Sequence, residues 1–329
     1  MTETKRILSG MRATSDKLHL GNYEGALKNW VRLQHESKMY SMVADWHVLT
    51  TAAEDPTDIR HNAKEVAKDF VAAGLDPAKT SIFIQSDVKE HAELHLLLSM
   101  VVGVGKLERT PTYKEKTAEI TGDRIISYGL LGYPVLQAAD ILLYKPSGVP
   151  VGRDQAPHLE LSREIGRSFN AIFGEVFPEF ADIINEDELT AKLPGLDMRK
   201  MSKSYGNVLN LNSTPDEIAS AVKSAFTTPT KIKKTDPGIP EGCAVCQYLK
   251  VYSPDWEQQW AEDVAGERGC MQSKKELTDL LVAYLEPIWK RRAELDDATI
   301  EDILKKGTEE AREFASKTMD EVRKAMRLA

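Results

Sequence analysis

The chain has 329 residues, of which 42% are hydrophobic and 29% are charged, and its formal net charge is -8. This length and apolar content allow a large core divided over about two domains. The acidic balance argues against a protein that coats nucleic acid by bulk electrostatics and leaves room only for a local basic patch. Three cysteines are few and odd in number, which fits a reducing cytoplasm. We expect neither a signal peptide nor a membrane span, because no apolar run approaches about 20 residues.

Strand and helix patterns alternate in the first part of the chain. Three short apolar stretches predict strands, at Arg6–Met11, within Met39–Thr51 and at Thr80–Asp87. One helix is expected from near Tyr23, and a second follows Pro56 and ends at Gly74. Strands that alternate with helices of this length predict an α/β fold with a doubly wound, Rossmann-like parallel sheet.

A further helix is predicted to start at Pro134 in "YPVLQAADILLY". Its period places Tyr133, Gln137 and Asp140 on or near one face. A carboxylate on an otherwise apolar helix is costly to bury without a donor, so Asp140 needs a partner. That partner is either a ligand or a neighbouring group of the protein, as in a helix cap or a salt bridge.

Strand patterns fade after Thr214, where a threonine cap and Pro215 open a helix. Two long amphipathic helices follow and extend to the C-terminus. The pattern predicts an α/β domain over residues 1–208 and an all-helical domain over 209–329, with the boundary near Tyr205–Ser213. The last helix is expected to pack back on the first domain.

Two motifs have the residues of a phosphate site. "KMSKSYGN" (Lys200–Asn207) places two cations on a hydroxyl-rich loop, which is either a solvated turn or a clamp for phosphate oxygens. In "DKLHLGNYEGALKNW" (Asp16–Trp30), a polar loop leads into a helix that is expected to begin near Asn22. Helix N-termini bind anions, and Gly21 would let a ligand approach the backbone closely. An ordinary turn with a structural His19 is the alternative.

Together these motifs resemble those of class I aminoacyl-tRNA synthetases. The stretches "GNYEGALKNW", "VADWHVLTT", "FIQSDVKEHAELHLLLSM", "YPVLQAADILLY" and "KLPGLDMRKMSKSYGN" extend the resemblance to bacterial tryptophanyl-tRNA synthetases over nearly the whole chain. The resemblance implies a cytoplasmic homodimer that activates L-tryptophan with ATP and Mg²⁺. It then transfers tryptophan from the adenylate to its tRNA, with the helical domain binding the anticodon.

The resemblance also implies three groups of site residues. The catalytic group is His19, Asn22, Lys114, Lys200 and Lys203. The ATP-binding group is Arg12, Ala13, Thr14, Gly21, Asn22, Gly152, Arg153, Asp154, Leu193, Lys200, Met201, Ser202, Lys203 and Ser204. The tryptophan-binding group is His47, Tyr133, Gln137, Asp140, Val149, Val151 and Gln155. No metal ligand is implied, since Mg²⁺ arrives with ATP.

Within these groups, Asp140 is expected to accept the indole N–H, and Leu193 and Met201 to sandwich adenine. Lys200 and Lys203 are expected to stabilise the departing pyrophosphate. Lys114 has a solvated charge run as its alternative. For His47 the alternative is a structural role. For His158 a structural role is preferred over a catalytic one.

The chain departs from the family's pattern at three places. Ala13 replaces a proline of the first loop, Ser15-Asp16 stands where one glycine is usual, and Arg153 stands where many relatives have glutamate. Some long relatives hold an iron–sulfur cluster on four cysteines. Here two of the matching positions are Cys243 and Cys270, the other two are Asp263 and Ser273, and Cys246 is additional. We therefore expect neither a cluster nor zinc.

Three other functions compete with this prediction. A tyrosyl-tRNA synthetase shares the fold, a dinucleotide-forming nucleotidyltransferase shares the HxGH-like start, and a synthetase paralogue without catalysis would bind RNA only. In the helical domain, Lys231, Lys233 and Lys234 form either a phosphate contact or, as the preferred interpretation, a solvated loop.

Overall fold

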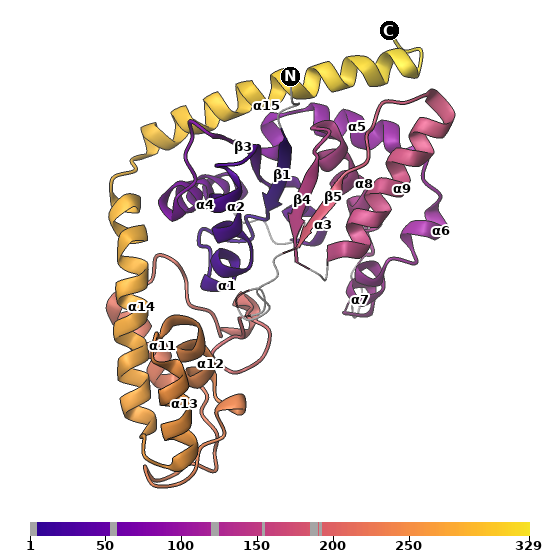
Figure 1. The fold of residues 1–329 in the computed structure, drawn as a ribbon. Coiled ribbons are helices and arrows are strands. Elements are labelled where there is room, and N and C mark those ends of the chain that lie inside the picture. Colours follow the sequence, from indigo (N-terminus) through magenta and orange to yellow (C-terminus); the bar gives the residue numbers. More distant parts are fainter. Residues whose placement is uncertain (1–4, 53–57, 120–124, 153–154, 185–189, 191–192) are drawn as a thin grey trace.

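The computed structural model describes residues 5–52, 58–119, 125–152, 155–184, 190 and 193–329. Its sheet has the strand order β3-β2-β1-β4-β5, and the four strand pairings are parallel (Figure 1). The strands are β1 (Arg6–Met11), β2 (Lys38–Val43), β3 (Thr80–Ile84), β4 (Gly148–Val151) and β5 (Ala181–Ile184). The chain builds outward from β1 to β3 and then returns to β4 on the other side of β1. This confirms the predicted doubly wound sheet.

Helices connect these strands. They are α1 (Leu20–Asn22), the π-helix η1 (Tyr23–Leu27), α2 (Lys28–Leu33), α3 (Trp46–Ala52), α4 (Ile59–Ala73), the short η2 (Gln85–Asp87), α5 (Glu90–Ser99), α6 (Val104–Leu107), α7 (Pro111–Glu119), α8 (Tyr128–Leu143) and α9 (Ala156–Phe173). Gly74 ends α4 with a φ of 117°, as the sequence predicts, because glycine adopts this conformation without strain.

The predicted start of α8 at Pro134 is wrong. The helix begins at Tyr128, where the hydroxyl of Ser127 accepts a hydrogen bond from the N–H of Leu130 at 3.1 Å. Pro134 therefore lies inside the helix, in its second turn. Because a serine cap satisfies an N–H of the first turn, it marks a helix start more reliably than a proline further along.

The sheet separates two apolar cores. Ile7 and Met39 point into a first core that includes α2 and α4, whereas Leu8 and Tyr40, their neighbours along the strands, point into a second core with α5, α8 and α9. This alternation follows from the pleat, which turns successive side chains to opposite faces. The elements that carry chemistry at one end of the sheet are therefore anchored from both faces.

The C-terminal region is helical, as predicted. After the single turn η4 (Lys203–Tyr205) of the preceding loop, it contains α11 (Pro215–Ser224), η5 (Pro240–Gly242), α12 (Ala244–Tyr252), α13 (Trp256–Ala265), α14 (Cys270–Ala293) and α15 (Asp297–Ala325). Thr214 and Glu217 form a reciprocal cap at the start of α11. Leu277 and Leu281 of α14 belong to the first core, so the helical region and the sheet share apolar packing.

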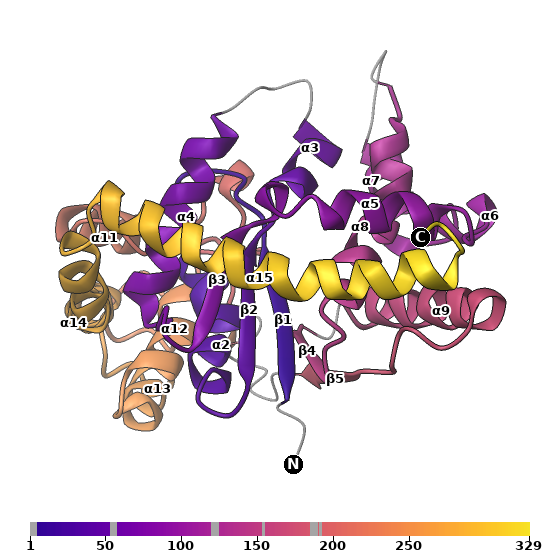
Figure 2. The ribbon, with the colours of Figure 1, turned by 90° about the horizontal axis from the view of Figure 1, so that it is seen from above.

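Helix α15 packs back along the sheet at β3 (Figures 1 and 2). Ile300 and Leu304 lie in the first core, and Ala311 and Ala315 lie in the second. Gly307 stands between these pairs, and a Cβ there would lie 2.0 Å from the carbonyl oxygen of Ile82. The helix can bridge both cores only because this position has no side chain.

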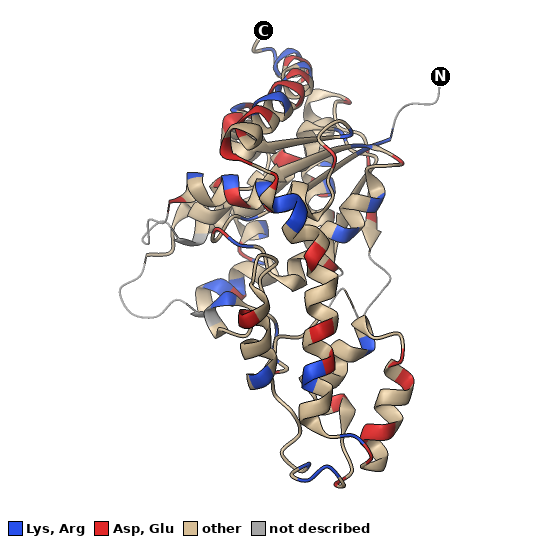
Figure 3. Ribbon diagram, turned by 90° about the vertical axis from the view of Figure 1, so that its left-hand side faces the viewer, with Lys and Arg blue, Asp and Glu red and all other residues tan. Residues whose placement is uncertain are grey.

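Acidic and basic residues are mixed along the surface of these helices (Figure 3). Among the described residues, no helix combines the length and the apolar character needed to cross a membrane. The described residues also contain no cluster of three or more His, Cys, Asp and Glu side chains suited to a metal ion.

Replacing Gly307 with alanine should lower the free energy of unfolding by about 1–3 kcal/mol, because the added methyl overlaps the β3 backbone. Gly105→Ala in α6 is the matched control, since a Cβ there would meet only Arg109 Nη1 at an ordinary 3.5 Å. Urea denaturation of both variants measures the difference. A Gly307→Ala protein as stable as the Gly105→Ala protein would show that the contact between α15 and β3 is not tight.

Candidate active site

A cavity of about 400 Å³ lies where the strand order reverses, at the carboxyl ends of β1 and β4. Ligands of doubly wound sheets bind at this point because the flanking connections leave the sheet in opposite directions. Ser9 and Gly10 line the cavity from β1, and Val149 and Val151 line it from β4. The remaining walls come from β2, η1, α2, α3, α7, α8 and the start of α9.

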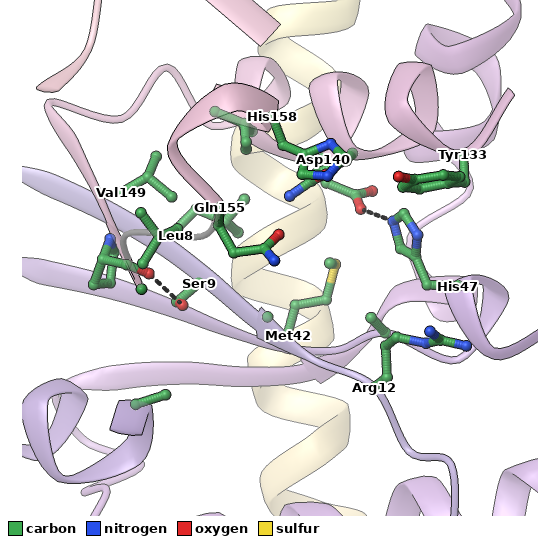
Figure 4. Close-up of a pocket in the computed structure, with 18 of the residues that line it drawn as sticks. Leu8, Ser9, Arg12, Met42, His47, Tyr133, Asp140, Val149, Gln155 and His158 are labelled. Atoms are coloured by element: carbon green, nitrogen blue, oxygen red, sulfur yellow. Dashed lines mark hydrogen bonds and ion pairs between the residues drawn. The ribbon is translucent and has the colours of Figure 1, made fainter. Parts of the chain in front are cut away.

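All seven residues of the predicted tryptophan-binding group line this cavity (Figure 4). They are His47, Tyr133, Gln137, Asp140, Val149, Val151 and Gln155. His47 lies in the first turn of α3, four residues after β2 ends at Val43. The cavity therefore combines apolar strand residues with a few polar groups, as small-molecule sites commonly do.

Asp140 is the most completely hydrogen-bonded of these residues. Its carboxylate is 3% exposed. It accepts bonds from His47 Nε2 at 2.8 Å, from His91 Nδ1 at 2.7 Å, and from Gln85 Nε2 at 2.8 and 2.9 Å to its two oxygens. Burial opposes the charge, but the bonds from His47 and His91 outweigh it and lower the pKa of Asp140 to about 2. The group is therefore an ionised acceptor at neutral pH.

His91 is itself held from behind. Its Nε2 lies 3.0 Å from the hydroxyl of Tyr144, a fully buried residue at the end of α8. Burial raises the pKa of Tyr144 well above its ordinary value, so the hydroxyl keeps its proton. In the neutral imidazole this proton is donated to Nε2, and Nδ1–H is left to bond Asp140.

The second motif forms a helix start beside the cavity. His19 caps α1: its Nδ1 accepts from the N–H of Asn22 at 3.2 Å, and Asn22 Oδ1 accepts from the N–H of His19 at 3.1 Å. Burial, helped by the charge of Lys203, lowers the pKa of His19 to about 4. His19 is thus neutral at pH 7, and because Nδ1 is an acceptor, Nε2 carries the proton.

The KMSKS loop lies against this helix start. The N–H of Gly21 points at Met201 Sδ, 3.3 Å away. Lys203 Nζ donates to Ser15 Oγ and to the carbonyl oxygen of Lys17, and burial lowers the pKa of its ammonium group. Lys200 is exposed. The fold thus brings together two motifs separated by about 180 residues.

The remaining ATP-binding predictions have varied positions. Arg12 and Gly152 line the cavity, whereas Ala13 and Leu193 are buried in the first core. Thr14 is exposed, and the backbone N–H of Ser202 donates to Asn207 Oδ1 at 2.8 Å. Arg153 and Asp154 lie outside the described residues, as does the side chain of Ser204.

Helix α7 offers a different lysine from the one predicted. Lys114 is exposed and is not among the cavity residues, whereas Lys116, two positions later, lines the cavity. His158, for which a structural role is preferred, also lines the cavity and bonds Thr112 Oγ1 at 2.8 Å. The motif "TYKEK" contains both lysines, and only the orientation of α7 distinguishes them.

The cysteine region has a buried ion pair. Lys231 Nζ lies 3.3 Å from Asp263 Oδ1, and both side chains are buried. Cys246 Sγ lies 3.9 Å from Asp263 Oδ2, and Cys243 is buried beside it at the start of α12. The solvated loop preferred for Lys231 is therefore wrong, and so is a phosphate contact, because its ammonium group is already bonded inside the helical region. Lys233 and Lys234 are exposed.

Comparisons with known proteins agree with this geometry. The family described as tRNA synthetases class I (W and Y) matches residues 1–286. Tryptophan–tRNA ligases of Thermotoga maritima and Aquifex aeolicus are 47% and 42% identical to the chain, over 98% of its length and 99% and 100% of theirs. The crystal structure of tryptophanyl-tRNA synthetase from Campylobacter jejuni complexed with ADP and tryptophan superposes with a TM-score of 0.86 at 33% identity, covering 98% of this chain and 99% of that one.

The match of the family over most of the chain, and of these relatives over nearly all of it, agrees with the sheet order and with the meeting of the two motifs. The chain belongs to the class I tRNA synthetases of the tryptophan and tyrosine family.

Proposed function

We propose that the protein activates L-tryptophan with ATP and transfers it to the tRNA for tryptophan. The observation that carries this proposal is the buried, ionised Asp140 in a cavity beside the two nucleotide motifs. Full-length relatives that are tryptophan–tRNA ligases support it, as does the neighbour that binds ADP and tryptophan. These relatives favour tryptophan over tyrosine as the substrate.

Tryptophan selection rests on the N–H of indole. Asp140 is the buried anion of the cavity and can accept this single donor. Val149 and Val151 supply apolar surface for the ring, and Gln155 is assigned to the amino and carboxylate groups of the amino acid. The side chain of phenylalanine has no N–H. It would contact the apolar surface but make no hydrogen bond to Asp140, so the site should bind it less well than tryptophan.

Activation joins a carboxylate oxygen of tryptophan to the α-phosphorus of ATP. The bond from this phosphorus to the bridging oxygen breaks, and pyrophosphate leaves with the electron pair. The start of α1 offers phosphate oxygens the Nε2–H of neutral His19 and the side-chain N–H of Asn22. The N–H of Gly21 joins them when it exchanges its contact with Met201 Sδ for phosphate. Lys200 and Lys203 stabilise the charge of the departing group, for which Lys203 exchanges its contacts with Ser15 and Lys17 for phosphate.

Mg²⁺ enters with ATP in this proposal and neutralises phosphate charge when bound. Lys116 supplies a further cation at the cavity and replaces Lys114 as the α7 lysine in reach of the nucleotide. The helical region from 209 to 329 is assigned the binding of the tRNA anticodon. The protein is assigned to the cytoplasm.

We also assign a homodimer to the protein. Helices α5, α6 and the segment that opens α8 expose large apolar side chains, namely Leu96, Met100, Val104, Ile125 and Tyr128. Because α5 and α6 both pack on α8, these exposed side chains belong to neighbouring elements, as expected of an association surface. Sedimentation equilibrium at micromolar concentration should find twice the chain mass, and a monomer would contradict the assignment.

Replacing Lys203 with alanine should lower the rate of tryptophan-dependent pyrophosphate exchange roughly 10²-fold, while equilibrium binding of tryptophan changes little. Lys274→Ala is the matched control, because Lys274 Nζ also donates two hydrogen bonds, here to the carbonyl oxygens of Lys223 and Ala225 in the helical region. If the Lys203→Ala protein exchanges pyrophosphate at the control's rate, the KMSKS loop is only a surface turn.

Replacing Asp140 with alanine should lower tryptophan activation roughly ten- to a hundredfold, since a hydrogen bond to a charged group contributes about 1.5–3 kcal/mol. Asp140→Asn keeps one acceptor oxygen and should lose less. Both changes should narrow the preference for tryptophan over phenylalanine. Asp263→Ala removes a buried carboxylate far from the cavity and controls for general destabilisation. Faster activation of tyrosine than of tryptophan by the wild type would refute the substrate assignment.

A further inference from the structure

Three side chains hold the Asp140 carboxylate, and they differ in their access to the cavity. His47 lines the cavity and its side chain is 11% exposed. Gln85 and His91 are fully buried and are not among the residues that line the cavity. A ligand in the cavity can therefore meet His47, whereas Gln85 and His91 can act on it only through Asp140.

The two oxygens of the carboxylate have different partners. Oδ1 accepts from Gln85 at 2.8 Å and from His91 at 2.7 Å, both behind the cavity wall. Oδ2 accepts from Gln85 at 2.9 Å and from His47 at 2.8 Å. Because an ionised carboxylate has about four acceptor directions, all of them are in use. The direction taken by His47 is the one that a donor in the cavity can reach.

We propose that Gln85 and His91 are positioning residues for tryptophan selection, because they fix the plane of the Asp140 carboxylate. Oδ2 then presents a single acceptor direction to the cavity. The indole N–H of tryptophan takes this direction over from His47. Gln85 sets the plane because one amide nitrogen contacts both oxygens. His91 sets the rotation by holding Oδ1 away from the cavity. The inference rests on the proposed function, since it concerns the recognition of tryptophan.

The hydroxyl of Tyr144 extends this support by one more residue. Its contact with His91 Nε2 directs the Nδ1 proton of the neutral imidazole toward Asp140. The alternative is that the network only stabilises the packing of α5 against α8. That alternative predicts a loss of stability with unchanged preference among amino acids, whereas positioning predicts a change in preference.

The protonation of Asp140 gives a second readout. The titratable groups that act on it are His47 on α3, His91 and His95 on α5, and Tyr144 at the end of α8. Tyr40 on β2 and Glu90 on α5 act in turn on Tyr144, and His158 on α9 lines the same cavity. Burial raises the pKa of Asp140 and the histidine bonds lower it. Removing His91 therefore raises this pKa and makes tryptophan binding weaker as the pH falls toward 5. Wild-type Asp140, with its pKa of about 2, stays ionised over the same range.

The experiment compares Gln85→Met and His91→Leu, which remove the donors at similar volume, with His91→Asn, whose side-chain amide nitrogen can replace Nδ1. Gln34→Met is the matched control, because Gln34 is a buried glutamine of the same domain that donates to the carbonyl oxygens of Val31 and Gly74, away from the cavity. Pyrophosphate exchange gives kcat and KM for tryptophan, phenylalanine and ATP at several pH values between 5 and 8.

Gln85→Met and His91→Leu should raise KM for tryptophan about tenfold or more and reduce the tryptophan-to-phenylalanine ratio of kcat/KM by a similar factor. KM for ATP should stay within about twofold. His91→Asn should restore most of the preference, and Gln34→Met should match the wild type. Relative to the wild type at each pH, the His91→Leu protein should lose tryptophan affinity as the pH falls.

An unchanged KM for tryptophan and an unchanged preference in both donor variants would overturn the inference. If these variants do not fold, Tyr144→Phe removes one oxygen from the same chain of hydrogen bonds. It should raise KM for tryptophan a few-fold, and a wild-type value would again overturn the inference. A wild type that does not activate tryptophan at all refutes the proposed function instead, so the two failures are distinguishable.

Discussion

A carboxylate buried at the switch point of a parallel sheet must be surrounded by donors, or it will take up a proton. Asp140 satisfies this constraint with side chains from α3, η2 and α5, while its own helix supplies Tyr144 behind them. Each of these elements must be fixed relative to the others to within a fraction of an ångström for the bonds to form. The packing of α5 on α8 and the depth of the second core both serve this arrangement.

The nucleotide side depends on a comparable convergence. Leu20 N–H donates to the carbonyl of Leu209 at 2.7 Å, and Leu211 N–H donates to the carbonyl of Leu18 at 2.8 Å. These two bonds pair the helix start at His19–Asn22, the HxGN motif, with the segment that follows the KMSKS loop. Within the loop, Asn207 Oδ1 accepts from the backbone N–H of Ser202 at 2.8 Å, and Asn207 Nδ2 donates to the carbonyl oxygen of Lys200 at 3.1 Å. A loop tied in this way can exchange the contacts of Lys203 without disturbing the sheet.

A buried glutamate joins the helical region to the same helix. Glu24, in the π-helical turn after the HxGN motif, is 1% exposed and accepts from the hydroxyls of Tyr252 at 3.2 Å and Tyr284 at 2.6 Å. The two tyrosines belong to α12 and α14, so a shift of the helical region acts directly on the helix that begins at the nucleotide site. The shared first core reinforces this connection.

The sequence predicts those features that depend on local pattern. Short apolar runs between turns predict β1 and β3, and Thr214 and Pro215 predict the start of α11. The meeting of the two motifs is predicted by the family resemblance, which implies the whole fold. The sequence does not predict features that depend on contacts between residues far apart in the chain. Gln85 and His91 reach Asp140 across about 50 residues, and the burial of Lys231 depends on Asp263, 32 positions later. The residues next to one of these in the sequence do not indicate which distant residue will be its partner.

The crystal structure of the protein with bound tryptophan tests the central claim most directly. The indole nitrogen should lie about 3 Å from Asp140 Oδ2, in the direction that His47 occupies in the free protein, with the contacts of Gln85 and His91 to the carboxylate retained. An indole nitrogen bonded elsewhere, or a carboxylate that has rotated away from Gln85 and His91, would contradict the account.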